Sequence, residues 1–150
     1  MEMNDSQRIA APRQTVYDAL NDPEVLKQCI PGCEELEMVS ETEMNAKVVL
    51  RIGPVKARFA GAVELSDLVP PESYTISGEG KGGVAGFAKG GAKIRLVEEG
   101  DETVLEYKVK ADIGGKLAQL GSRLIDSTSK KLAAQFFSKF SEIVEQRSAA

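Results

Sequence analysis

The sequence predicts an α+β domain in which an antiparallel sheet of about six or seven strands curves around one long C-terminal helix. Apolar and polar residues alternate from about residue 44 to residue 111, as in strands with one buried face. From about residue 115 to residue 147 apolar residues recur every three or four positions, as on one face of a helix. With 150 residues, the chain can bury a core without disulfides or a metal. We expect a single domain over residues 1–150.

Two short helices are predicted to follow a first strand near residues 2–10. Pro12 stands where a helix can begin, and apolar residues at helical spacing continue to Leu20, before Asn21. Asp22 and Pro23 then provide an N-cap and a proline at the first helical position. The second helix should end at Cys29, before the next proline.

The strands that follow are predicted from alternation and from the turns between them. A hairpin turns at Gly53-Pro54, the prolines at 70 and 71 end its second strand, and a later turn falls at residues 99–101. The strands are marked by apolar residues spaced two apart: Met44, Ala46, Val48, Leu50, Ile52, Ala57, Phe59, Val63, Leu65, Tyr74, Ile76, Ala92, Ile94, Leu96, Leu105, Tyr107, Val109 and Ala111. Their regularity predicts a meander with one apolar face.

The last segment is predicted to be one helix of roughly 32 residues and about 50 Å, interrupted only by Gly121. A sheet that encloses such a helix tends to leave a cavity where the two curvatures do not match. The apolar stripe is broken by Thr128, beside Ser127. Their hydroxyls either bond back to the preceding turn of the helix or face a polar spot in the cavity.

Several classes of site are excluded by the composition. The chain has no histidine and only two cysteines, so Ser-His triads, Cys-His dyads and histidine-based metal sites are impossible. We expect no metal and no covalent cofactor. The net charge of −4 argues against nucleic-acid binding. The start of the chain has neither a signal peptide nor an apolar run of membrane-spanning length, which predicts a cytoplasmic protein.

Glycines crowd residues 78–91, where they match the letter pattern of a dinucleotide-binding loop. The surrounding strands are antiparallel and no βαβ unit is present, so we interpret the segment instead as a glycine-rich lid that carries Phe87. Cys29 and Cys33 enclose a Pro-Gly corner. We expect reduced thiols there, although the spacing leaves a disulfide between them open.

Four segments of the chain resemble the CoxG family, the G-type subunits of carbon monoxide dehydrogenase. They are residues 29–34 (CIPGCE), residues 59–61 (FAG), the glycine-rich residues 78–91, and residues 115–125 (GKLAQLGSRLI) with Phe136-Phe137 after them. This family belongs to the START-like (SRPBCC) helix-grip superfamily of hydrophobic-ligand binders. The resemblance implies a helix-grip fold, which agrees with the prediction from periodicity.

The resemblance further implies an accessory, non-catalytic protein that accompanies a molybdenum hydroxylase of the carbon monoxide dehydrogenase type. Family members are associated with binding an apolar partner such as a quinone or lipid, with membrane recruitment and with electron delivery. Because the sequence here ends at residue 150, we expect any membrane association to be peripheral, at the inner face of the cell membrane. The expected ligand-binding residues are Phe59, Tyr74, Ile76, Phe87, Ile94, Leu96, Tyr107, Leu120, Leu124 and Thr128.

Two alternatives remain open. Related helix-grip proteins include cyclases and hydrolases of aromatic or polyketide-like substrates, and Tyr74, Tyr107 or an inward-facing Glu79 could serve such an enzyme as acid or base. The other alternative is an assembly chaperone with a closed core and no ligand.

Overall fold

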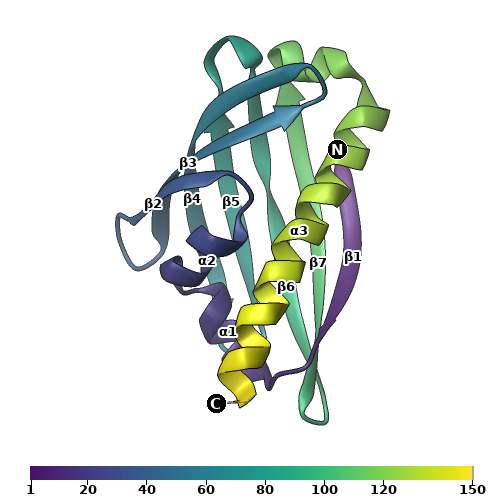
Figure 1. The fold of residues 1–150 in the computed structure, drawn as a ribbon. Coiled ribbons are helices and arrows are strands. Elements are labelled where there is room, and N and C mark those ends of the chain that lie inside the picture. Colours follow the sequence, from purple (N-terminus) through teal and green to yellow (C-terminus); the bar gives the residue numbers. More distant parts are fainter. Residues whose placement is uncertain (150) are drawn as a thin grey trace.

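A seven-stranded antiparallel sheet curves around one face of the long helix α3 (Ser122–Ala149) in the computed structural model, which describes residues 1–149 (Figure 1). The strands lie in the order β1-β7-β6-β5-β4-β3-β2. Their bounds are β1 (Glu2–Ile9), β2 (Cys33–Met38), β3 (Glu43–Ile52), β4 (Val55–Val69), β5 (Ser73–Lys81), β6 (Phe87–Glu99) and β7 (Glu102–Gly114). The predicted fold class is confirmed. No helix in residues 1–149 is both long and apolar enough to cross a membrane.

Helices α1 (Arg13–Leu20) and α2 (Pro23–Cys29) connect β1 to β2, the two opposite edges of the sheet. They begin and end close to the predicted positions. The Asp22 carboxylate accepts a hydrogen bond of 3.0 Å from the backbone N–H of Glu24, and Pro23 occupies the first turn of α2. This cap explains why the chain starts a second helix two residues after ending the first.

The hydrophobic core fills the half of the molecule where α1 and α2 pack against the C-terminal half of α3 (Figure 1). Phe140 and Val144 of α3 are fully buried there. The ring of Phe136 stacks on that of Phe140 at a centroid distance of 5.7 Å, and Tyr107 stacks on Phe137 at 5.3 Å. These contacts anchor α3 to the sheet at one end of the helix.

The predicted single C-terminal helix is wrong in its first turns. Residues Gly115–Leu120 form a separate 3₁₀ helix, η2, and α3 begins only at Ser122. Gly121 separates the two with a φ of 90°, a left-handed backbone conformation that glycine adopts without strain. Apolar spacing alone does not reveal this break, because Leu117 is buried like the residues of α3.

The glycine-rich residues 78–91 form mostly paired strand and not a lid. Gly78 and Gly80 belong to β5, and Phe87 and Gly90 belong to β6. The two strands pair residue by residue, with Gly78 opposite Gly90. Only the short turn between them, with the 3₁₀ helix η1 (Gly83–Ala85), lies outside the sheet.

Both cysteines are free thiols at the corner between α2 and β2. Cys29 is buried, and this burial raises the pKa of its thiol to about 11. Cys33 is half-buried and donates its S–H to the Glu35 carbonyl at 3.4 Å. Burial therefore keeps the Cys29 thiol protonated and shielded at neutral pH.

Replacement of Phe140 should test the anchoring of α3. We expect Phe140→Ala to lower the free energy of unfolding by about 3–5 kcal/mol, because it removes a fully buried ring. Urea denaturation measures the change. Val84→Ala is the control, since Val84 is 85% exposed, and it should stay within about 0.5 kcal/mol of the parent. A small loss for Phe140→Ala would contradict the proposed anchor.

Alkylation should distinguish the two cysteines. At neutral pH we expect iodoacetamide to modify Cys33 in the native protein and to leave Cys29 unmodified until urea is added, because only the thiolate reacts and Cys29 is buried. Raising the pH toward 11 should increase the reaction at Cys29. Peptide mass spectrometry locates the label. Equal rates at neutral pH would contradict the burial described here.

Candidate functional site

A cavity of about 470 Å³ lies between the sheet and the N-terminal half of α3, at the end of the molecule away from the core. Its walls are almost entirely apolar. The lining side chains include Ile30 after α2, Val48, Leu50 and Ile52 of β3, Phe59 and Val63 of β4, Ile113 of β7, Leu117 of η2, and Ile125, Thr128, Ser129 and Leu132 of α3. The size and the apolar walls are typical of a site for a small organic molecule.

The cavity exists because the sheet carries very small residues beneath this part of α3. Ala46, Gly61, Gly80 and Ala88 are successive partners across strands β3, β4, β5 and β6, and all four line the cavity. A Cβ atom added to Gly80 would have no heavy atom within 4 Å. Backbone and methyl groups alone therefore form the floor, and the space above them is left open.

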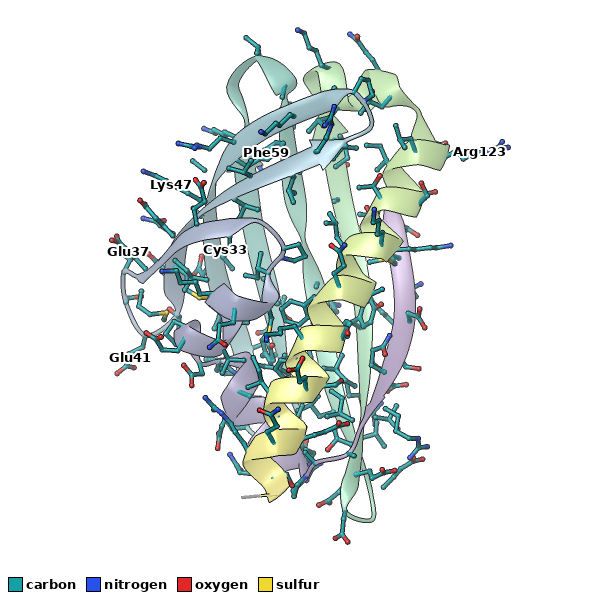
Figure 2. The ribbon with its side chains drawn as sticks, viewed as in Figure 1. Cys33, Glu37, Glu41, Lys47, Phe59 and Arg123 are labelled. Carbon is teal, nitrogen blue, oxygen red and sulfur yellow. The ribbon has the colours of Figure 1, made fainter. Side chains whose placement is uncertain are left out.

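The tip of the β3–β4 hairpin reaches the start of α3 at the rim of the cavity. A Cβ atom on Gly53, whose φ is 58°, would lie 2.8 Å from Leu124 Cδ2. Similarly, a Cβ on Gly82 would lie 2.6 Å from the ring of Phe59, so that ring covers the glycine. Figure 2 shows Phe59 in this half of the molecule and Arg123 pointing away from it.

No charged group is directed into the cavity by the side chains that the structure describes. Glu79 is among the lining residues, but its carboxylate belongs to the outer face of the sheet, 3.9 Å from Lys81 Nζ. Thr128 and Ser129 contribute the hydroxyl groups of the wall. The arrangement favours an uncharged apolar molecule, because a buried ionised group needs a partner.

The two alternatives for the serine and threonine hydroxyls are both realised, at different residues. Ser127 is exposed and donates its hydroxyl to the Leu124 carbonyl at 3.1 Å, back along the helix. Thr128 lines the cavity instead. One turn of α3 thus carries both behaviours on its two faces.

Larger hollows on the outer face of the sheet differ in character. One of about 640 Å³ is lined by residues such as Glu37, Lys47 and Lys81, and one of about 730 Å³ by residues such as Lys93 and Glu106. Figure 2 shows Glu37 and Lys47 on the outside of the molecule. Charged walls and an open position make these hollows solvated grooves.

Of the ten expected ligand-binding residues, Phe59 and Thr128 line the cavity, and Leu124 lies at its rim against the hairpin tip. The others lie elsewhere. Leu120 is half-buried in η2, Ile76 packs against the core, and Phe87 is 42% exposed, with its ring covering Gly114. Four lie within the core: Tyr74, Ile94, Leu96 and Tyr107.

The core tyrosines lie far from the cavity and remain protonated. Tyr74 is six residues from Gly80 along β5, which is about 20 Å at 3.3 Å per residue. Burial raises the pKa of Tyr74, and its ring meets that of Tyr17 edge-on at 5.6 Å. Burial also raises the pKa of Tyr107, with a smaller contribution from the nearby Asp5 carboxylate.

The small residues of the cavity floor were not among the predicted ligand-binding residues. The signal for them was present, because Gly78 and Gly80 alternate on one face of β5 and Ala46 and Gly61 occupy apolar positions of their strands. Aromatic and aliphatic residues were expected instead. Within residues 1–149 no group of three or more Cys, Asp and Glu side chains is placed to hold a metal ion.

Similar folds occur in solved structures. A conserved protein from Geobacillus kaustophilus is 31% identical over 97% of this chain and 96% of its own, with a TM-score of 0.92. A START superfamily protein from Mycobacterium smegmatis is 14% identical, with 97% of each chain covered and a TM-score of 0.74. The ZhuI aromatase/cyclase from Streptomyces sp. R1128 is 11% identical over 98% of this chain and 94% of its own, with a TM-score of 0.69.

The fold is therefore START-like, with the sheet gripping α3. No curated protein sequence matches the chain. The family model for CoxG, the G-type subunit of carbon monoxide dehydrogenase, matches residues 6–145, which is nearly the whole chain. The chain belongs to the carbon monoxide dehydrogenase CoxG family.

Proposed function

We propose that the protein is a non-catalytic accessory protein that carries an uncharged lipophilic molecule between the sheet and α3. The observation that carries this proposal is the apolar cavity of about 470 Å³ above a floor of glycine and alanine. Burial of apolar ligand surface supplies the binding energy there, and no charge has to be desolvated. The CoxG family, which is named as an accessory component of its enzyme, supports this role.

The partner enzyme in this proposal is a molybdenum hydroxylase of the carbon monoxide dehydrogenase type, and the ligand is a quinone or another lipid. In the quinone case, the bound quinone accepts two electrons from the enzyme together with two protons from solvent, and it leaves as quinol. The support is the family to which the chain belongs and the uncharged character of the cavity.

Peripheral association with the inner face of the cell membrane is the third part of the proposal. Val84, in the β5–β6 turn, is 85% exposed, and Phe87 beside it is 42% exposed. Lys81 and Lys89 flank these two residues in the sequence. Exposed apolar side chains next to lysines favour contact with the surface of an anionic bilayer.

An enzyme of the cyclase or hydrolase type is less well supported. Tyr74 and Tyr107 lie in the core, and the Glu79 carboxylate lies on the outer face beside Lys81. None of these acid–base groups is directed at a molecule in the cavity, as catalysis of proton transfer requires. A chaperone with a closed core is also less well supported, because the half of the molecule around Gly80 is hollow.

Filling the cavity should abolish binding. We expect Gly80→Leu to place a side chain in open space above the floor, and therefore to leave folding intact while displacing the ligand. The measurement is the fluorescence of N-phenyl-1-naphthylamine, a neutral lipophilic probe, titrated with protein. Ala62→Leu, on the outer face of β4, is the matched control and should bind as the parent does. Undiminished binding by folded Gly80→Leu would refute the cavity as the site.

Membrane contact can be tested by moving a charge between two ends of the sheet. Val84→Asp should reduce sedimentation of the protein with vesicles that contain phosphatidylglycerol, because it places a carboxylate at the apolar tip. Leu68→Asp is the control, since Leu68 is 42% exposed near the β4–β5 turn, at the opposite end of β5. Equal losses for the two variants, or no loss, would exclude this surface.

A further inference from the structure

Thr128 and Ser129 are adjacent residues of α3, and both line the apolar cavity. Neither hydroxyl has a hydrogen-bond partner among residues 1–149, whereas the neighbouring Ser127 hydroxyl donates to the Leu124 carbonyl at 3.1 Å. Serine and threonine within helices commonly bond back to the preceding turn, so the two hydroxyls of the cavity differ from the usual arrangement. They remain available to a bound molecule.

Surroundings of this kind make an unbonded hydroxyl costly. The other side chains directed into the cavity are apolar, so a ligand that displaces water from the wall also removes the water partners of these hydroxyls. A ligand that carries an oxygen at the right edge restores the lost bonds, and a pure hydrocarbon does not. The cavity therefore discriminates between ligands of the same shape.

The opposite wall defines the shape of the ligand. Gly61, Gly80 and Ala88 present only backbone and a methyl group across three adjacent strands, and a Cβ on Gly80 would meet nothing within 4 Å. This floor is broad and lacks projecting side chains. A planar ring system can lie flat against such a surface, with Phe59 at its side and α3 above it.

We propose that Thr128 and Ser129 form the polar anchor of the cavity and select an uncharged, flat ring system with a carbonyl or hydroxyl oxygen at its edge. This inference rests on the proposed carrier function and specifies the class of ligand. The ring lies on the floor around Gly80, and its oxygen accepts a hydrogen bond from one or both hydroxyls. Both residues are positioned by α3, which the core holds at its other end.

Two probes that differ only in their oxygens test the anchor. They are 2,3-dimethyl-1,4-naphthoquinone, which has no free quinone-ring carbon for reaction with thiols, and 2,3-dimethylnaphthalene. Each competes with N-phenyl-1-naphthylamine for the purified full-length chain. We expect Thr128→Val and Ser129→Ala each to weaken binding of the quinone about three- to tenfold, the effect of one lost hydrogen bond, and to leave the hydrocarbon unchanged. Ser127→Ala is the matched control and should alter neither probe.

Infrared spectra supply a second measurement. The carbonyl stretch of the bound quinone should lie at lower frequency in the parent than in Thr128→Val/Ser129→Ala, because a donated hydrogen bond weakens the C=O bond. Equal quinone affinity and an unshifted carbonyl band in the double variant would overturn the anchor while leaving the carrier function intact. Failure of the parent to bind either probe would overturn the carrier function itself.

Discussion

The inner face of the sheet carries large side chains along only half of its length, and this constraint determines where the molecule is solid and where it is hollow. Toward one end, Tyr74, Leu96 and Leu105 fill the space beneath α3. Toward the other, Gly80 and its cross-strand partners leave that space empty. Because one continuous helix covers both halves, the packed half holds α3 at the height that the hollow half requires.

This division separates the residues that stabilise the fold from the residues that contact a ligand. Stability is concentrated around Phe140 and Val144, where burial is complete. The cavity half keeps half-buried side chains such as Val48 and Leu50, which do not complete a core by themselves. A ligand would bury them further, so binding and folding draw on the same physical effect at different ends of one helix.

Periodicity was sufficient to predict the sheet, its apolar face and the enclosed helix, and Asp22 with Pro23 was sufficient to predict the start of α2. It could not place the cavity along the strands. Tyr74 and Gly80 share one face of β5, and only the pairing of β5 with its neighbours shows which of them lies above the hollow. Gly121 was visible as an interruption, but its left-handed conformation depends on how η2 packs against η1.

The contact between Gly53 and Leu124 has a consequence for the kinetics of exchange. It joins a hairpin tip to the first turn of α3, and both segments lie outside the core that contains Phe140. A molecule can therefore enter or leave when this contact separates, without any rearrangement of the aromatic cluster. Residence time and resistance to unfolding are then controlled by different residues, and either can change in evolution without the other.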